Sequence, residues 1–334
     1  MERRETRFND RLARFSFSFQ PLMDLIVIIV SYNTRDLLSD CLESVFAGLE
    51  RSCLEGAVWV VDNASRDGSA EMVRRKFPNV HLIALDENLG FAAGNNVALR
   101  RIDLESLFPA RHVLFLNPDT RVLDDALGTL VRFLDDTPGT GAVGARLVNG
   151  DGSFQHSAFA FPGLAQIFFD FFPLHHRLLE SRLNGRYPRQ LYEAGRPFEI
   201  DHPLGAALMV RAEVLSQVGG FDERFFMYCE EIDLCRRIRQ AGCKLYCVPK
   251  AVIVHLVGQS TRQFRNEMFV ALWKSRILMV QKHESRVFLW AARRLIRLGL
   301  AAQARRARRL QRSGEIGEQE LEARLAAYRE VALL

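Results

Sequence analysis

Short apolar runs alternate with amphipathic stretches over the first half of the chain, from about residue 24 to residue 148. Five runs predict buried strands, at 25–30, 57–62, 80–85, 112–117 and 142–148. Between them, apolar residues recur at helical spacing and predict helices at 36–49, 69–77, 91–101 and 123–135. Strands separated by helices predict an α/β fold with a Rossmann-like, mostly parallel sheet and helices on both faces.

The second half of the chain is less uniform. Residues 149–204 are irregular and hold an aromatic cluster at 154–172. The pattern then predicts a strand at 205–210, helices at 212–218 and 230–240, and two short strands at 244–247 and 252–255. From residue 262 the chain is predicted to be helical to its end, with a break near Ser313-Gly314.

These patterns divide the chain into four parts. Residues 1–22 are rich in Arg and precede a second methionine, Met23, so we interpret them as a flexible extension or as the product of a start assigned too early. The alternative for this part is a small docking segment. Residues 23–150 and 151–260 are predicted to form two halves of one α/β domain, and residues 261–334 a helical, Arg-rich C-terminal extension.

Composition excludes several classes of protein. The 334 residues are 48% hydrophobic and 25% charged, as in ordinary globular proteins, which excludes a disordered or collagen-like chain. Six cysteines are too few for a disulfide scaffold and indicate reduced thiols. The longest apolar run, 25–30, is far shorter than the roughly 20 residues of a spanning helix, and the N-terminus lacks the apolar core of a signal peptide. We therefore expect a cytoplasmic protein.

Positive charge is concentrated near the C-terminus. The formal net charge is +5, but nine Arg and no acid lie between Arg286 and Gly314, so the rest of the chain is acidic. This distribution argues against a core that binds nucleic acid. Apolar residues that include Phe288 and Trp290 are interleaved with the Arg residues, as in helices that lie on an anionic membrane surface. The alternative is a solvated helix face.

Polar loops follow four of the predicted strands, and all four are expected at one edge of the sheet. The loops are Ser31-Tyr32-Asn33, Asp62 to Ser69, Asp86 to Asn96, and Asn117-Pro118-Asp119. Dinucleotide-binding, P-loop, HExxH and GxSxG motifs are missing from the sequence. The pattern predicts one composite site at this edge.

Single residues within these loops have two interpretations each. Asp62 is suited to bind a base or a ribose, or else to cap the helix near Ser69. Gly90 and Gly94 enter a helix whose backbone N–H groups suit a phosphate, although Gly is also common in turns. Asp119 beside Asn117 suits Mg²⁺ or Mn²⁺ holding a diphosphate, and its alternative is an Asx turn.

Taken together, the loops resemble glycosyltransferase family 2, the inverting GT-A type. The matching segments include Val30 to Asn33, Asp62 to Ser69, Asn88 to Asn95, Phe115 to Thr120 and Gly220 to Arg236. The resemblance covers about residues 24–280, and within the family it is strongest to the rhamnosyltransferase-like branch that acts on cell-surface polysaccharides. It implies a GT-A fold that binds a dTDP- or UDP-sugar and transfers a hexose, such as L-rhamnose from dTDP-rhamnose, to a glycan or lipid-linked acceptor. Enzymes on lipid-linked acceptors would benefit from a peripheral position on the inner face of the cytoplasmic membrane.

The resemblance also implies a role for each matching residue. The loop of Ser31, Tyr32 and Asn33 together with Asp62 resembles the pocket for the nucleotide, and the stretch containing Asn88, Gly90, Phe91, Gly94 and Asn95 resembles the lining for ribose and donor sugar. Asn117-Pro118-Asp119 resembles the Asp-x-Asp motif, with Asp119 as a ligand of Mg²⁺ or Mn²⁺ and Asn117 in place of the first Asp. His255 matches a His near the diphosphate, and we expect it at the metal together with Asp119.

Glu230-Glu231 occupies the position of the family's Glu-Asp pair, whose second member resembles the catalytic base. The resemblance therefore favours Glu231 as the base and leaves Glu230 as the alternative. By themselves the two acids also suit the positive end of a helix dipole, without any catalytic role. Two other functions stay open: a sugar nucleotidyltransferase, and a non-catalytic nucleotide-sugar-binding or scaffold protein of the same pathway.

Overall fold

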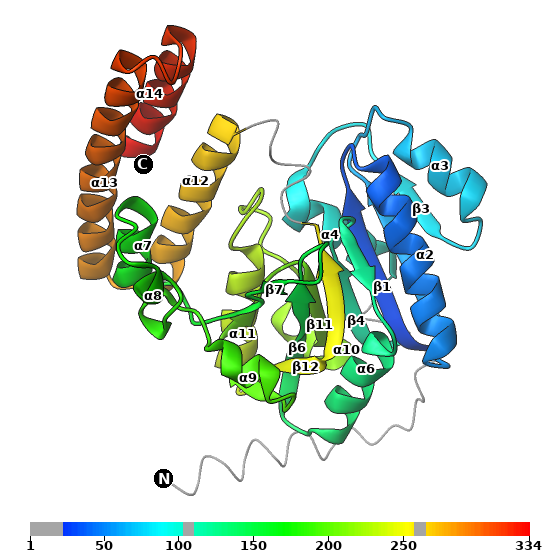
Figure 1. Cartoon of the computed structure of the whole chain (residues 1–334). Coiled ribbons are helices and arrows are strands. Elements are labelled where there is room, and N and C mark those ends of the chain that lie inside the picture. The colour runs from blue at the N-terminus through cyan, green and yellow to red at the C-terminus, as the bar shows by residue number, and fades with distance from the viewer. Residues whose placement is uncertain (1–22, 103–109, 257–264) are drawn as a thin grey trace, which may run out of the picture.

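The computed structural model describes residues 23–102, 110–256 and 265–334. The predicted extension at 1–22 lies outside the described residues. Figure 1 shows an α/β body and, beside it, a group of long helices formed by the C-terminal part of the chain.

The first half of the chain supplies the strands and helices predicted from its pattern, with one short strand added. Its elements are β1 (Met23–Ser31), α2 (Arg35–Arg51), β2 (Gly56–Asp62), α3 (Ser69–Lys76), β3 (His81–Ala84), α4 (Gly90–Ile102), β4 (Ala110–Leu116), β5 (Thr120–Val122), α6 (Ala126–Asp136) and β6 (Thr140–Val148).

The second half contains several short elements before its longer ones. They are β7 (Phe154–Gln155), β8 (Ala158–Phe159), α7 (Leu164–Phe171), α8 (His176–Leu179), the 3₁₀ helix η1 (Arg182–Asn184), α9 (Arg189–Glu193), β9 (Phe198–Ile200), β10 (His202–Pro203), β11 (Ala207–Arg211), α10 (Ala212–Val218), α11 (Glu230–Gln240), β12 (Lys244–His255), α12 (Arg265–His283), α13 (Arg286–Arg312) and α14 (Glu318–Ala332).

One sheet carries most of these strands. Within the described residues it has ten strands, in the order β3-β2-β1-β4-β11-β6-β12-β5, with β7 beside β6 and β9 beside β12. Strands β3, β2, β1 and β4 are parallel, and so are β6 and β12. Strand β11 runs antiparallel between β4 and β6. The predicted α/β fold with a central sheet is confirmed, and the sheet is mixed, with β3-β2-β1-β4 and β6-β12 as its parallel parts.

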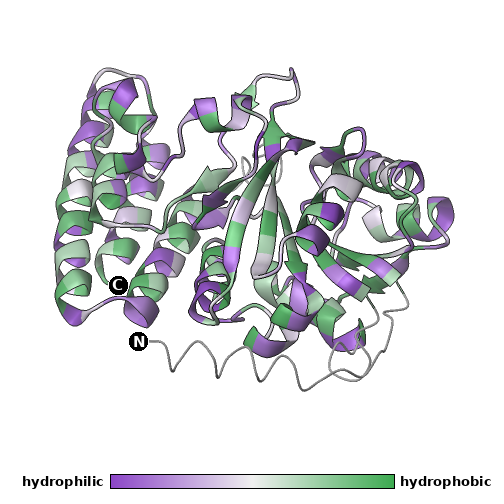
Figure 2. Ribbon diagram, turned by 90° about the horizontal axis from the view of Figure 1, so that it is seen from below, coloured by the Kyte–Doolittle hydropathy of each residue, from purple (hydrophilic) through white to green (hydrophobic). Residues whose placement is uncertain are grey.

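The apolar runs are buried on both faces of the sheet because successive side chains of a strand point to opposite sides. In β1, Leu25, Val27 and Ile29 pack in one core, with side chains of α2, α3 and α6. The alternate residues of β1, among them Ile26 and Ile28, pack in the other core, with side chains of α4, α10 and α11. Figure 2 shows the central strands largely in the hydrophobic colour. Helices therefore cover both faces, as predicted.

Two local predictions are wrong. The predicted strands at 244–247 and 252–255 are one strand, β12, whose pairing with β6 shifts between Val248 and Val252. Pro249 lies in this interval and has no N–H for the ladder, which explains the broken apolar pattern. The helix predicted at 123–135 begins later, at Ala126, because β5 ends at Val122 and residues 123–125 form the turn between strand and helix.

The C-terminal helices pack on one another and on α7. Trp273 of α12 is 2% exposed and lies in a core with Ile296 of α13 and Val331 of α14. Gly299 of α13 packs directly against the ring of Phe171. A Cβ at this position would lie 2.1 Å from a ring carbon, so a larger residue has no room here. The helical extension is thus confirmed, and its predicted break near Ser313-Gly314 separates α13 from α14.

Candidate active site

The parallel strands bring the predicted loops to one edge of the sheet. Ser31 at the end of β1 pairs in register with Asp62 at the end of β2, and Asp62 pairs with Ala84 of β3. Strand β4 lies on the other side of β1 and ends at Leu116, directly before Asn117. The four loops therefore leave neighbouring strands in the same direction.

The first two loops hold each other through polar contacts. The backbone N–H of Asn33 donates to Ser65 Oγ at 2.9 Å, and the N–H of Arg66 donates to Asn33 Oδ1 at 2.8 Å. Ser31 is buried, and its hydroxyl bonds to that of Thr34. Tyr32 is 36% exposed at the rim. In this structure Asn33 therefore shapes the pocket and engages its side chain with the neighbouring loop.

Asp62 has one carboxylate oxygen engaged and one free. Its Oδ2 accepts a hydrogen bond from the N–H of Ser65 at 3.1 Å. Its Oδ1 is buried and has no partner among the described residues. A buried acceptor without a partner is costly, so this oxygen is suited to a ligand donor such as a nucleoside hydroxyl or N–H.

The third loop is shaped by Asn63, which the motif reasoning did not select. Asn63 Nδ2 donates to Asn88 Oδ1 at 2.8 Å and to the carbonyl of Gly90 at 3.1 Å, and its Oδ1 accepts from the N–H of Leu89. Asn88 Oδ1 also accepts from the N–H of Gly90 at 2.9 Å. Asn88 is therefore a turn-forming residue through its Oδ1, and its place in the lining of the donor pocket stays a prediction.

Helix α4 begins at this turn and lies close to β1. Gly90 has a φ of +83°, and Gly94 leaves room for Val30, since a Cβ there would lie 2.9 Å from Val30 Cγ1. The ring of Phe91 packs edge-on against Phe221 at a centroid distance of 6.0 Å. Asn95 is 1% exposed, and its Oδ1 has no partner in the described structure. Among Gly90, Phe91, Gly94 and Asn95, only Asn95 has a buried side-chain oxygen without a hydrogen-bond partner in the described structure.

The fourth loop places Asp119 against His255. Asp119 is 7% exposed, and its Oδ1 lies 3.5 Å from His255 Nε2. Burial raises the pKa of Asp119 above its usual value, although the nearby His255 opposes that shift. Burial likewise lowers the pKa of His255, against the charge of Asp119. The pair is therefore a buried carboxyl group beside a buried imidazole, and burial shifts each toward its neutral form.

The orientation of the imidazole is fixed by Gln155 of β7, a residue that the motif reasoning missed. Gln155 Oε1 lies 2.9 Å from His255 Nδ1, and Gln155 Nε2 donates to Asn149 Oδ1 at 2.9 Å. Because an amide oxygen only accepts, Nδ1 carries the proton and the Nε2 lone pair is directed toward Asp119. A lone pair beside a carboxylate oxygen suits a cation between them, and an imidazole oriented through its other nitrogen is typical of metal ligands.

These two residues fit a divalent cation only in part. Among residues 23–102, 110–256 and 265–334, no group of three or more His, Cys, Asp or Glu side chains is placed to hold an ion. Mg²⁺ and Mn²⁺ commonly take one or two protein ligands and complete their coordination with phosphate oxygens and water. Asp119 and His255 therefore fit a cation that is shared with a bound diphosphate.

The acidic pair lies in the first turn of α11. Tyr228 and Cys229 precede it with φ values of +71° and +67°, a sharp change of direction that is uncommon for residues other than Gly. Glu230 is 6% exposed, and its Oε2 lacks a partner within the described chain. Burial, together with the charge of Glu231, raises the pKa of Glu230 well above its usual value.

Glu231 combines access with a suitable pKa. Its side chain is only partly buried, and the burial of its carboxylate raises the pKa to about 7. It packs on Gly205, where a Cβ would lie 3.4 Å from Glu231 Cγ. The next residue, Ala206, accepts a hydrogen bond from the N–H of Asn117 at 3.0 Å. The carboxylate that titrates near neutral pH therefore lies beside the Asn117–Asp119 turn.

A cavity of about 280 Å³ borders this turn of α11. Its wall combines apolar side chains with amides, charged groups and an aromatic ring; its residues include Phe159, Gln166, Asn184, Arg186, His202, Leu204, Cys229, Ile232, Arg236, Arg276 and Met279. Leu204 adjoins Gly205, and Ile232 follows Glu231. The cavity thus borders the first turn of α11 from the side of residues 149–204, and neither Glu230 nor Glu231 is among the described residues that line it.

The family model "Glycosyl transferase family 2" matches residues 26–218, which hold the first four loops. The chain belongs to glycosyl transferase family 2. This glycosyltransferase is similar to an N-acetylglucosaminyl-diphospho-decaprenol L-rhamnosyltransferase of Mycobacterium tuberculosis, with 29% identity over 71% of this chain and 77% of the relative. It is also similar to rhamnosyltransferase WbbL of Escherichia coli, with 26% identity over 73% of this chain and 87% of the relative. The predicted rhamnosyltransferase-like branch is confirmed, and the chain is a glycosyltransferase of polysaccharide synthesis.

Solved structures confirm the GT-A fold of the glycosyltransferase. Mannosyltransferase PcManGT from Pyrobaculum calidifontis, solved with GDP-Man and Mn²⁺, aligns with a TM-score of 0.53 at 20% identity, covering 98% of this chain and 87% of its own. GalNAc-T7, solved with UDP, GalNAc and Mn²⁺, aligns with a TM-score of 0.55 at 15% identity, covering 78% of this chain and 48% of its own.

Proposed function

We propose that the protein is an inverting glycosyltransferase that moves L-rhamnose from dTDP-rhamnose to a hydroxyl of a lipid-linked glycan acceptor, using Mg²⁺ or Mn²⁺. The observation that carries the inverting mechanism is the position of Glu231, whose pKa is about 7, beside the Asn117–Asp119 turn. The similarity to rhamnosyltransferases, one of them an N-acetylglucosaminyl-diphospho-decaprenol L-rhamnosyltransferase, supports the sugar and the lipid-linked acceptor.

In this mechanism Glu231 takes the proton from the acceptor hydroxyl as that oxygen attacks the anomeric carbon. A base works best when its pKa is near the working pH, which fits a carboxylate shifted to about 7. Glu230 lies more deeply buried beside it, and burial together with the charge of Glu231 raises its pKa well above the usual value. We place the acceptor in the cavity lined by Leu204 and Ile232, whose neighbours in the chain are Gly205 and Glu231.

The donor lies across the ends of β1, β2 and β4. Asp62 binds the nucleoside through its free Oδ1, and the turn at Gly90 fixes the start of α4 beside the donor. Asp119 and His255 hold the divalent cation together with the diphosphate. When bound, such a cation supplies positive charge that stabilises the leaving diphosphate.

The donor is tested by the thermal stability of the protein with a panel of nucleotide sugars, with and without Mn²⁺. A ligand that binds only the folded state raises the melting temperature, and the stabilisation grows with the logarithm of its concentration over Kd. We expect dTDP-rhamnose with Mn²⁺ to give the largest shift, and release of dTDP to follow when an acceptor is added. Stabilisation without nucleoside diphosphate release under any condition would favour the non-catalytic alternative.

Asp62→Ala is predicted to weaken dTDP binding by about 5- to 100-fold, the cost of losing one buried hydrogen bond to the ligand. Asp67 in the same loop provides the matched control, because its carboxylate bonds to the N–H groups of Arg35 and Ser69 and holds only protein groups. Asp67→Ala should lower the melting temperature and leave the Kd of dTDP nearly unchanged. Calorimetric titration with dTDP and Mn²⁺ measures the Kd of each variant, and thermal unfolding measures its melting temperature. If Asp62→Ala behaves like Asp67→Ala, Asp62 serves only the turn.

We further propose that α13 binds the protein to an anionic membrane on its cytoplasmic face. Among the described residues, no helix has the length and apolar character to cross a bilayer. The outer face of α13 exposes Val287, Trp290 and Leu298, at 76%, 62% and 65%. Arg294 and Arg305 lie on the same face, and α13 contains no acid. Exposed apolar and cationic side chains on one face match a lipid surface with negative headgroups.

The packing of α13 decides how this proposal is tested. Removing residues 286–334 would uncover the core around Trp273, so substitutions on the outer face are cleaner. Arg294→Gln, Arg297→Gln and Arg305→Gln together should reduce binding to phosphatidylglycerol vesicles by about 10²-fold or more at low salt, at about 1 kcal/mol per charge. The control is the equally charged variant Arg74→Gln, Arg75→Gln and Arg101→Gln on exposed helix surfaces elsewhere. Equal losses in both variants, measured by vesicle sedimentation, would contradict a role for α13.

A further inference from the structure

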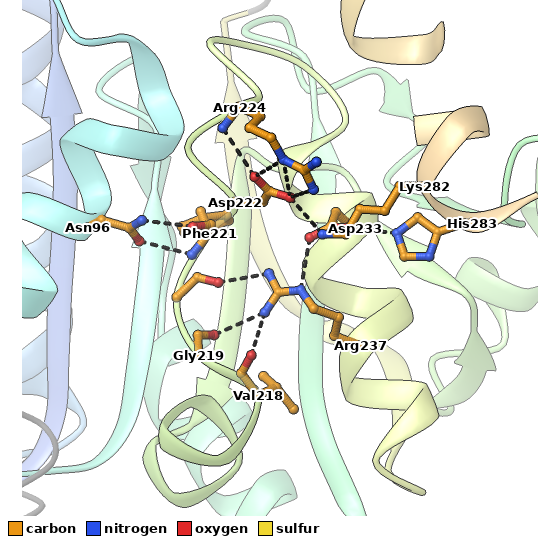
Figure 3. Close-up of polar contacts among 11 residues, drawn as sticks. Asn96, Val218, Gly219, Phe221, Asp222, Arg224, Asp233, Arg237, Lys282 and His283 are labelled. Atoms are coloured by element: carbon orange, nitrogen blue, oxygen red, sulfur yellow. Dashed lines mark hydrogen bonds and ion pairs between the residues drawn. The ribbon is translucent and has the colours of Figure 1, made fainter. Parts of the chain in front are cut away.

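Residues 219–229, here called the bridging segment, connect α10 to the acidic pair of α11. Figure 3 shows the polar contacts that hold its first part. From α11, the guanidinium of Arg237 donates to three successive carbonyls: Val218 at 2.7 Å, Gly219 at 3.2 Å and Gly220 at 2.7 Å. One side chain of the base-bearing helix therefore fixes the beginning of the segment.

Helix α4 holds the same segment from the donor side. Asn96 Nδ2 donates to the carbonyl of Phe221 at 2.8 Å, and Asn96 Oδ1 accepts from the N–H of Phe221 at 2.9 Å, across 125 residues of sequence (Figure 3). Asn96 is 8% exposed. The contact requires Gly220, because a Cβ there would lie 2.4 Å from Asn96 Oδ1. This two-way bond is specific for an amide side chain.

The later part of the segment touches the donor turn. The carbonyl of Phe226 accepts a hydrogen bond from the N–H of Phe91 at 2.8 Å. A Cβ on Gly90 would lie 2.2 Å from that carbonyl oxygen, so the two backbones are in direct contact. Two residues beyond Phe226, the chain turns sharply at Tyr228 and Cys229 and enters α11. Only Met227 therefore separates the residue that contacts the donor turn, Phe226, from the sharp turn that leads into the acidic pair.

A buried carboxylate keeps Arg237 in place. Asp233 is 0% exposed and contacts Arg237 Nε at 2.8 Å, Lys282 Nζ at 2.6 Å and His283 Nε2 at 2.7 Å (Figure 3). Burial alone would raise the pKa of Asp233, but its bonds to Lys282 and His283 and the charge of Arg237 hold that pKa below the usual value. Lys282 also contacts Asp222 of the segment at 2.7 Å. The network therefore joins α11, α12 and the bridging segment.

We propose that Asn96 and Arg237 are positioning residues that set the place of Glu231 relative to the donor turn, by holding the bridging segment from both sides. The inference rests on the proposed function, in which Glu231 is the base. The polar atoms of both side chains are engaged with groups of the protein itself. A displacement of about 1 Å in a catalytic group costs about 100-fold in rate. Loss of the contacts that Asn96 or Arg237 makes with the bridging segment should therefore reduce turnover without removing a ligand contact.

Two conservative variants test this role. Asn96→Asp keeps the size and the acceptor but cannot donate to the Phe221 carbonyl. Arg237→Lys keeps the charge beside Asp233 but cannot reach three carbonyls. Arg239→Lys is the matched control, because Arg239 lies on the same helix and pairs at the surface with Glu199. We expect kcat for dTDP release from dTDP-rhamnose, with water as acceptor, to fall by about 10- to 100-fold in the two variants and the Kd of dTDP to change less than about threefold.

Hydrogen exchange provides a readout that does not need turnover. The N–H of Asp233 donates to the carbonyl of Cys229 at 2.9 Å and reports whether the first turn of α11 is in place. Its exchange should be faster in Asn96→Asp and Arg237→Lys and unchanged in Arg239→Lys. Unchanged exchange in both variants, or equal losses of kcat and dTDP affinity, would overturn the inference. If the wild type releases no nucleoside diphosphate from any sugar nucleotide, the proposed function fails, and the exchange experiment still decides the positioning role.

Discussion

Replacing Glu231 by Gln is expected to lower turnover by about 10²–10⁴-fold, the usual contribution of a general base. The amide has nearly the same shape as the carboxylate but cannot accept the proton of the acceptor hydroxyl. Binding of dTDP should remain, because the residues assigned to the donor lie on other loops. Steady-state release of dTDP, together with a dTDP titration, separates the two effects.

Glu230→Gln is the matched variant for this experiment. Adjacent helical residues point about 100° apart, so only one of the two acids faces the acceptor. Glu230 is buried and has a strongly raised pKa, so an amide at this position imitates its protonated state. We expect a milder loss than for Glu231→Gln. The reverse order of effects would assign the base to Glu230, and full activity of both variants would remove the base from α11.

The pH dependence supplies a second measure of the same residue. With a pKa of about 7, Glu231 is ionised above neutral pH, so kcat/KM should rise with pH and level off above about 7. The two acids interact, and the observed midpoint belongs to the pair. In Glu231→Gln the remaining activity should lose this rise. A wild-type profile that is flat between pH 5.5 and 8.5 would contradict the assignment.

The same shift has a consequence for stability, with the opposite sign. The folded state binds the proton of Glu231 more tightly than the unfolded chain does, so between about pH 4.5 and 7 the folded state holds more protons. The free energy of unfolding therefore falls as pH rises through that range. Glu231→Gln should be at least as stable as the wild type above pH 7, which excludes misfolding as the cause of its low turnover.

The sequence was sufficient for the parts of the site that depend on sheet register. Apolar runs fix which segments become parallel strands, and the carboxyl ends of parallel strands share one edge. The sequence alone therefore predicts that Ser31, Asp62 and Asn117 lie together. The same logic could not say which side chains turn toward a ligand. Asn33 and Asn88 have their side-chain oxygens bonded to neighbouring loops, and only contacts across 25 or more residues reveal this.

Residues that orient or hold a neighbouring group could not be predicted from the sequence either. Gln155 lies in a two-residue strand, too short for a periodic pattern, yet it sets the protonated nitrogen of His255. Asn96 lies one position after Asn95 in the same motif, and nothing in its spacing shows that it bonds to Phe221. A cluster of amide residues in a buried helix face is the one available signal, because buried amides need partners.

Asp119→Asn is expected to make dTDP binding independent of divalent cations. In the wild type, the Kd of dTDP should be far lower in Mn²⁺ than in EDTA, and in Asp119→Asn the two values should coincide. The fold should survive, because the N–H of Leu256 bonds to the backbone carbonyl of Asp119 and not to its side chain. Burial already raises the pKa of Asp119, so a neutral amide relieves an unfavourable charge. Calorimetric titrations in both buffers give the comparison.

Two further variants distinguish a cation site from a general loss of binding. Gln155→Leu removes the partner that orients His255 and leaves both proposed ligands in place, so we expect Mn²⁺ affinity in the presence of dTDP to fall by about 10- to 100-fold. Asp136→Asn, on the exposed end of α6, removes the same charge away from the site and should change nothing. We expect the loss of Mn²⁺ affinity to be largest in Asp119→Asn, smaller in Gln155→Leu and absent in Asp136→Asn. This order follows only if His255 and Asp119 share the cation. Equal dTDP affinity of the wild type in Mn²⁺ and in EDTA would instead assign the buried pair to the structure of the loop.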